Sequence, residues 1–244
     1  VPLVHFDTRP HDLRVRGAIE IVSSPGNWFG HLASLKGSED MTRLAASVRG
    51  EILCEIHARD TGFSPVTALK VLREELPADA VVTADVGSHL HLLGQQWDVM
   101  RGRLVMTNGW SSMGFGLPAA VAAAMAGGRG AVVCITGDGG FLMHAGEIIT
   151  ARRYGLRIIT VVLADGELNL IKVKQSWKRI SPYGIQLCNG PLLGAGSFLG
   201  VDVMRVTDAA GMRTAIRKSL ESAHSTIIEA AIDASLYGDL IVKS

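Results

Sequence analysis

The sequence predicts an α/β protein with a doubly wound, mostly parallel β-sheet, and three observations indicate this fold class. Apolar runs of strand length recur along the chain, among them 131–136 and 158–164. Segments with helical periodicity separate these runs, and glycine-rich turns follow several of them. Because a strand that is buried on both faces reads as a continuous apolar run, we expect helices on both faces of the sheet.

The elements follow one another in a regular order. Two extended stretches, 3–6 and 18–22, come first, and a helix over 41–57 follows. Ser64 and Pro65 then supply an N-cap side chain and a proline at the first helical position, so a helix begins there and runs to about Leu76. The remaining strands are expected at 80–84, 104–107, 131–136, 158–164, 201–206 and 226–232. The helices between them are expected at 88–97, 115–125, 145–154 and 208–223, with a further helical start near Phe141.

The bulk composition excludes several classes of function. The chain has 244 residues, of which 48% are hydrophobic and 19% charged, so it can bury a sizeable core. Its formal net charge of +1 comes without a basic run, which argues against nucleic-acid binding. No apolar run is long enough to span a bilayer, and no secretory signal opens the chain. From the charge and the length of the apolar runs we expect a protein that binds neither nucleic acid nor membrane. The three dispersed cysteines lead us to expect a cytoplasmic protein.

Two acids stand where predicted strands end. Asp138 follows the run 131–136 and is flanked by glycines, and Asp165 follows the run 158–164. The carboxyl ends of parallel strands meet at one edge of the sheet, where ligands bind in open α/β folds. Paired carboxylates suit Mg²⁺, which proteins usually share with substrate phosphates, and glycines and helix N-termini offer backbone N–H groups to phosphate oxygens. The sequence therefore predicts that Asp138 and Asp165 hold Mg²⁺, which in turn holds a diphosphate.

Several other motifs are better explained without a site of their own. A lone Gly-Asp-Gly is most often a turn, but the spacing to Asp165 favours a site here. His89 and His91 lack a nearby acid or cysteine partner, so we expect no zinc site. The glycines of 194–200 half-match a dinucleotide fingerprint, without a clear strand before them or a suitably spaced acid. We expect a solvated face at Lys172, Lys174, Lys178 and Arg179.

Longer motifs point to one family. Gly137-Asp138-Gly139 is followed, after 24 intervening residues, by Ala164-Asp165, and two further segments read TADVGSHLHLLGQQW and TNGWSSMGFGLPAAVAAAMA. Together they resemble the thiamine-diphosphate-dependent 2-oxo acid enzymes, acetolactate synthase in particular. The segment VHFDTRPHDL is similar to the tail of that family's central domain. The resemblance implies a C-terminal remnant of a central α/β domain at 1–37, a linker with a helix at 38–61, and a Rossmann-like thiamine diphosphate/Mg-binding domain at 62–244.

The family pattern, carried onto this sequence, implies a set of site residues. The implied cofactor-binding residues are Gly87, Ser88, His89, Ser112, Met113, Gly137, Asp138, Gly139, Gly140, Asp165, Glu167 and Leu168. The implied metal ligands are Asp138, Asp165 and, through its backbone carbonyl, Glu167. No catalytic residue is expected in this chain, because the family's activating Glu belongs to an N-terminal domain without a counterpart here. We expect 164–183 to be a loop that its ligands tie down.

Three departures from the family pattern qualify the resemblance. Ser88 replaces the usual Gln, and Ala164 replaces the usual first Asn. The tripeptide 172–174, Lys-Val-Lys, stands where anabolic acetolactate synthases have Met-Gln-Trp, so a 2-oxobutyrate preference is not expected. The segment IKVKQSWKRIS is instead similar to the catabolic, pyruvate-only enzymes or to neighbouring carboligases and decarboxylases.

The resemblance implies a carboligase that decarboxylates pyruvate and joins the two-carbon unit to a second 2-oxo acid. It implies thiamine diphosphate and Mg²⁺ as cofactors, and a homo-oligomer, dimer or tetramer, whose neighbouring subunit supplies the pyrimidine half of the site. This chain alone would then be inactive. A 2-oxo acid decarboxylase or another carboligase or lyase of the family, a non-catalytic paralogue, and an NAD-type oxidoreductase on a similar sheet remain alternatives.

Overall fold

A computed structural model describes residues 4–7, 19–22, 39–98, 103–107, 109–127 and 130–241. The chain divides into two compact units, Val1–Glu51 and Ile52–Ser244. In the first unit, strands β1 (Val4–Asp7) and β2 (Ile19–Val22) pair in parallel, close to the two extended stretches expected there. Helix α2 (Glu39–Ala58) runs across the division between the units.

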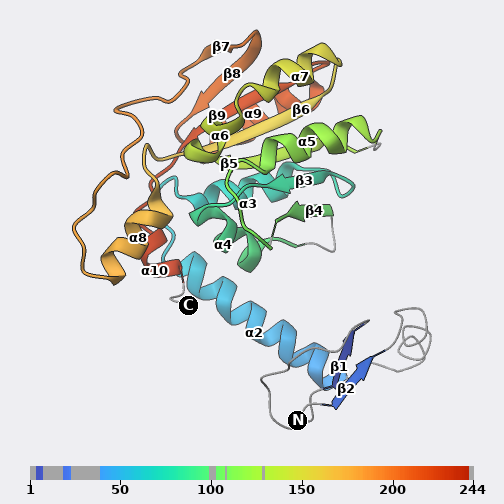
Figure 1. Cartoon of the computed structure of the whole chain (residues 1–244), viewed down its shortest axis with the longest axis vertical. Helices are drawn as coiled ribbons and strands as arrows, with labels where there is room; N and C mark the ends of the chain where they lie inside the picture. The colour runs from blue at the N-terminus through green and yellow to red at the C-terminus, as the bar shows by residue number, and fades with distance from the viewer. Residues whose placement is uncertain are drawn as a thin grey trace. The chain divides into compact units, whose positions relative to one another are not determined.

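The second unit is built on a seven-stranded sheet with the strand order β4-β3-β5-β6-β9-β8-β7 (Figure 1). Its strands are β3 (Val81–Ala84), β4 (Arg103–Met106), β5 (Val132–Gly137), β6 (Ile158–Ala164), β7 (Gly196–Phe198), β8 (Val201–Val206) and β9 (Thr226–Ala231). Neighbouring strands are parallel except β7 and β8, which pair antiparallel. The mostly parallel sheet confirms the predicted fold class.

Helices cover both faces of this sheet. They are α3 (Pro65–Glu75), α4 (Ser88–Gln96), α5 (Gly116–Met125), α6 (Asp138–His144), α7 (Glu147–Arg153), α8 (Asn169–Trp177), α9 (Ala209–Glu221) and α10 (Tyr237–Leu240). Helix α3 packs against α4 and α9, and α5 packs against α6 and α7. Helices α8 and α10 lie side by side beyond one end of the sheet (Figure 1). Within the described ranges, no helix is both long and apolar enough to cross a membrane.

The burial of the central strands explains why apolar and polar residues do not alternate along them. In β5, Val133 and Ile135 join the core beneath α3, α4 and α9, whereas Val132 and Cys134 join the core beneath α5 and α7. All four side chains are buried. A central parallel strand therefore needs apolar residues at every position, because both of its faces are covered.

Local sequence signals set several helix ends as predicted. The Ser64 hydroxyl accepts hydrogen bonds from the backbone N–H groups of Val66 and Thr67 at 3.1 and 3.2 Å, and Pro65 begins α3. Asp208 caps α9 in the same way, since its carboxylate accepts from the Gly211 N–H at 2.7 Å. These side chains satisfy donors that the first helical turn leaves without partners.

Three expectations about the elements were wrong. The helix after β5, α6, begins at Asp138 rather than near Phe141, whereas the helix expected at 145–154 is confirmed as α7. The segment 164–183 is not a loop throughout, because it contains α8, which buries Val173 and packs against α10. The antiparallel strand β7 was not foreseen, since three residues with two glycines nearby carry too little apolar pattern to indicate a strand.

Candidate functional site

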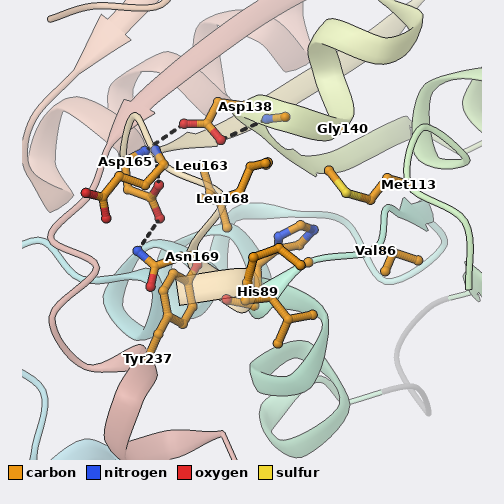
Figure 2. A pocket seen from close by; sticks show the side chains of 17 residues that line it. Val86, His89, Met113, Asp138, Gly140, Leu163, Asp165, Leu168, Asn169 and Tyr237 are labelled. Carbon is orange, nitrogen blue, oxygen red and sulfur yellow. Dashed lines mark hydrogen bonds between the residues drawn. The ribbon is translucent and has the colours of Figure 1, made fainter. Parts of the chain in front are cut away.

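A cavity opens at the carboxyl ends of strands β3, β5 and β6 (Figure 2). Its volume is about 70 Å³. The sequence-predicted residues that line it are Gly87, Ser88, His89, Met113, Gly137, Asp138, Gly139, Gly140, Asp165, Glu167 and Leu168. The wall is completed by Val86, Leu163, Asn169, Leu170, Ile171 and Tyr237. Residues from five separate segments of the sequence therefore meet in one place.

Asp138 connects the ends of the two central strands. Strands β5 and β6 are neighbours, with Gly137 in register with Leu163, so the acid that follows β5 lies beside the end of β6. Its side chain is buried, and one carboxylate oxygen accepts from the N–H of Gly139 at 2.8 Å. The other accepts from the Gly166 N–H at 2.7 Å, as Figure 2 shows. Burial raises the pKa of Asp138, and the backbone N–H groups oppose that rise.

Asp165 lies at the same sheet edge and carries a strongly perturbed carboxyl. Its two oxygens accept from the Glu167 N–H at 2.9 Å and from the side-chain amide of Asn169 at 3.2 Å. Burial and, secondarily, the negative charge of Asp138 raise the pKa of Asp165 to about 7. Burial disfavours ionisation of both carboxyl groups, and the charge of Asp138 adds to that penalty at Asp165, so a cation between them would relieve both penalties.

The chemistry of these donors fits Mg²⁺ in an open coordination shell. The part of the chain that the structure describes holds no group of three or more His, Cys, Asp or Glu side chains able to bind a metal. Two carboxylates alone leave most of an octahedral shell to be filled by carbonyl groups, water and ligand oxygens. This is the arrangement that Mg²⁺ adopts when it is shared with a phosphate ligand.

The first turn of α4 forms the opposite wall and presents free donors. Its N-cap is Gly87, which has no side chain to cap the first N–H groups of the helix. Ser88 Oγ and His89 Nε2 are buried and have no hydrogen-bond partner among the described residues. Burial lowers the pKa of His89 to about 4, so its imidazole is neutral at pH 7. Buried polar atoms without partners indicate that a ligand completes this wall.

Other side chains approach the two glycines after Asp138 closely, and the approach is least adjustable at Gly140, where hydrogen bonds hold the neighbouring Asp85 carboxylate. A Cβ on Gly139 would lie 2.7 Å from Leu168 Cδ2 and 3.0 Å from Met113 Cε. A Cβ on Gly140 would lie 2.8 Å from a carboxylate oxygen of Asp85. The two glycines therefore let the walls of the cavity come together at the start of α6.

Asp85, which sequence reasoning missed, holds the segment that carries Met113. It is 1% exposed at the end of β3, and its carboxylate accepts from the Gly114 N–H at 2.8 Å and from the Gly116 N–H at 3.3 Å. It also accepts from the Thr136 hydroxyl of β5 at 3.3 Å. One buried acid thus joins β3, β5 and the start of α5.

Two predicted side chains lie differently from the rest. Ser112 is outside the cavity wall: it is exposed, its hydroxyl donates to the Met113 carbonyl at 3.2 Å, and its cofactor role stays a prediction. Lys172 does not belong to a purely solvated face, because its ammonium group pairs with the Glu167 carboxylate at 2.6 Å. That ion pair forms because α8 brings residue 172 back over residue 167, which a loop would not do.

Two other features of the site were not predictable from local sequence. Asn169 contacts Asp165 because α8 begins immediately after the strand end, and Tyr237 reaches the cavity from α10 near the end of the chain. Neither residue belongs to a motif with an expected spacing. The half-matched dinucleotide segment, in turn, forms β7 and the turn into β8, whereas a dinucleotide site needs a strand-to-helix turn.

Comparison with known proteins identifies the family. Residues 85–230 match the thiamine pyrophosphate enzyme family, in its C-terminal TPP binding domain. The chain therefore belongs to this family, and the matched segment includes every strand end that lines the cavity. Because the chain belongs to the thiamine pyrophosphate family, we set aside the alternative of an NAD-type oxidoreductase.

Individual relatives agree with this assignment. The acetolactate synthase isozyme 2 large subunit of Escherichia coli is 33% identical over 180 residues, which cover 72% of this chain and 33% of the relative. An acetolactate synthase of Arthrospira platensis is 36% identical over 116 residues, covering 48% of this chain and 20% of that protein. The chain thus spans about a third of the length, or less, of these curated relatives.

A solved structure shares the fold. The thiamine diphosphate-dependent 4-hydroxybenzoylformate decarboxylase of Rhodococcus jostii superposes with a TM-score of 0.65 at 22% sequence identity. The superposition covers 72% of this chain and 34% of the decarboxylase. At this level of identity the likeness concerns the fold alone.

Proposed function

We propose that this protein is a carboligase of the acetolactate synthase type, which uses thiamine diphosphate and Mg²⁺ to decarboxylate pyruvate and to join the two-carbon unit to a second 2-oxo acid. The observation that carries the proposal is the pair of acids at adjacent strand ends, the buried Asp138 and the half-buried Asp165, in a chain of the thiamine pyrophosphate family. Relatives at 33% and 36% sequence identity are named acetolactate synthases, which supports this activity over others in the family.

In this proposal, the residues of the cavity bind the diphosphate of the cofactor and the metal ion that holds it. Asp138, Asp165 and the carbonyl of Glu167 hold Mg²⁺, and Gly139 and Gly140 let a diphosphate approach the backbone. Ser88 and the neutral imidazole of His89 donate hydrogen bonds to the diphosphate, which would satisfy atoms that otherwise lack partners. When bound, thiamine diphosphate supplies the electron sink that decarboxylation of a 2-oxo acid requires.

The apolar residues of the wall orient the ligand and exclude water. Leu168 and Met113 approach Gly139 from opposite segments, so they cover the start of α6 where the diphosphate would enter. Asp85 sets the position of Met113 through its bonds to Gly114. A dry wall beside the metal strengthens the electrostatic interactions on which binding depends.

We also infer that the functional unit is a homo-oligomer, a dimer or tetramer, whose neighbouring subunit completes the site. The cavity volume of about 70 Å³ supports this, because small-molecule sites typically enclose about 300–1,000 Å³. Large apolar side chains in the sequence segments that also contain the lining residues Met113 and Gly140 are exposed, among them Trp110 at 94% and Met143 at 59%. Sedimentation velocity with cofactor present tests this inference, and a monomer at all concentrations would contradict it.

The remaining proposals concern the domain boundaries and the cellular location. We infer that 1–37 belongs to a central domain, that 38–61 is a linker, that 62–244 is a cofactor domain, and that the location is cytoplasmic. Limited proteolysis of the enzyme that contains this chain would test the domain boundaries.

Calorimetric titration with thiamine diphosphate, in Mg²⁺ and again in EDTA, tests the proposed cofactors. We expect binding in Mg²⁺ only. The enzyme that contains this chain is then incubated with a panel of 2-oxo acids, pyruvate included, and its products are separated. Acetolactate formation supports the proposal, whereas release of an aldehyde without carboligation would assign a decarboxylase. Cofactor binding without any turnover would assign a non-catalytic paralogue.

A further inference from the structure

The cavity contains one polar side chain that no motif of the sequence indicates. Tyr237 opens α10, a four-residue helix near the end of the chain, and its ring forms part of the cavity wall below Asn169 (Figure 2). The residue is 2% exposed. It comes from a segment that folds under the site after the last strand of the sheet, so only the tertiary structure places it there.

The backbone around Tyr237 is firmly held. Its N–H donates to the Ala234 carbonyl and its carbonyl accepts from the Ile241 N–H, each at 3.1 Å. Upstream, the Asp233 N–H donates to the Phe63 carbonyl at 2.9 Å. The ring of Tyr237 packs in the same core as Leu236 and Ile241. Its orientation is therefore set by packing, and the hydroxyl is carried to the cavity by a rigid segment.

The hydroxyl itself has no hydrogen-bond partner among the described residues, although a buried tyrosine normally finds one. The carboxylates of Asp138 and Asp165 act on it electrostatically, but their hydrogen bonds go to backbone N–H groups and to the Asn169 amide and not to this hydroxyl. Burial and these two charges raise the pKa of Tyr237, so its hydroxyl remains a donor. A donor in this position lacks an acceptor, and the acceptor would have to enter the cavity.

We propose that Tyr237 is a cofactor-binding residue whose hydroxyl donates a hydrogen bond to a phosphate oxygen of the metal-bound diphosphate. This inference rests on the proposed function, since it requires a diphosphate between Asp138, Asp165 and the first turn of α4. A phosphate oxygen would supply an acceptor to donors that the wall leaves without one, at Ser88, His89 and Tyr237, while Asp138 and Asp165 would be held by the metal. The C-terminal segment thereby becomes part of the binding site.

The test compares Tyr237→Phe with Tyr154→Phe, a matched control on a side chain that is 56% exposed. Both variants keep the ring and lose only the hydroxyl. Calorimetry measures the affinity for thiamine diphosphate with Mg²⁺, and separately for inorganic pyrophosphate with Mg²⁺. We expect Tyr237→Phe to weaken both by about tenfold or more, because hydrogen bonds to charged groups contribute about 1.5–3 kcal/mol, and the control to match wild type. Equal affinities in the two variants would overturn the proposal.

Two further measurements separate binding from structural roles. The melting temperature without ligand should be unchanged in Tyr237→Phe, and a large decrease would show that the hydroxyl stabilises the fold instead. Mn²⁺ affinity without phosphate, read by electron paramagnetic resonance, should also be unchanged, and a loss there would place the hydroxyl on the metal rather than on the diphosphate. If wild type binds neither thiamine diphosphate nor pyrophosphate, the proposed function is overturned and the role of Tyr237 with it, whereas binding that Tyr237→Phe leaves unchanged overturns the role of Tyr237 alone.

Discussion

Replacing Asp85 by Asn tests whether one buried acid holds three segments of the site together. The carboxylate accepts from the N–H groups of Val86, Gly114 and Gly116 and from the Thr136 hydroxyl. An Asn side chain keeps the shape but has only one acceptor oxygen. The orientation that costs least keeps that oxygen at the Oδ1 position, where it still accepts from Val86 and Gly114.

The expected loss of stability in Asp85→Asn follows from the hydrogen bonds that this orientation of the Asn side chain cannot make. The amide group then faces the Gly116 N–H, and a buried donor without an acceptor costs about 1–3 kcal/mol. The loss of charge weakens the bonds that remain, so we expect the free energy of unfolding to fall by about 2–4 kcal/mol. For a domain of this size each kcal/mol shifts the melting temperature by about 2–4 °C, which gives a decrease of ~4–16 °C.

The assay is thermal and urea unfolding of Asp85→Asn beside Asp202→Asn, a control on an exposed residue of β8. We expect the control to lie within about 0.5 kcal/mol of wild type. If Asp85→Asn is as stable as its control, the hydrogen bonds around Asp85 do not hold the site. Cofactor affinity should fall together with stability, because Met113 lies in the segment that Asp85 anchors.

Three more outcomes are expected. Asp138→Ala should abolish Mg²⁺-dependent binding of thiamine diphosphate in calorimetry while far-UV circular dichroism stays native, and retained binding would exclude Asp138 as a ligand. The folded-state pKa of Asp165, about 7, lies above its ordinary value of 3.8, so the protonated form stabilises the metal-free fold. That stability should be full below pH 4 and be lost as the pH rises through 7, whereas Mg²⁺ affinity should fall about tenfold per pH unit below 7; melting curves and titrations that do not change with pH would contradict this. Glu229→Gln should cost about 1–3 kcal/mol in urea unfolding, because the Glu229 carboxylate accepts from the N–H groups of Leu192, Leu193 and Gly194, and an unchanged midpoint would be inconsistent with that role.

Much of the sheet and the position of its acids could be predicted, because the signals involved are local. The Ser64-Pro65 pair begins α3 through a cap that depends on residues two and three positions away. Asp138 and Asp165 follow apolar runs, and the carboxyl ends of adjacent parallel strands share one edge whatever the details of packing. Helix boundaries were less predictable: α6 begins at Asp138 itself, where a glycine-rich sequence with low helix propensity is held in a helix by the core around Phe141.

The residue pattern alone determined that this chain is an α/β protein with paired acids at two adjacent strand ends. Only the tertiary structure decided which other side chains meet those acids. The bonds of Asp85 reach residues up to 51 positions away, and the ring of Tyr237 enters from the end of the chain. Such contacts follow from how the layers pack and not from any local period, so no spacing in the sequence encodes them. The Lys172–Glu167 ion pair was missed for a different reason, because it requires the helix α8 where the sequence indicated a loop.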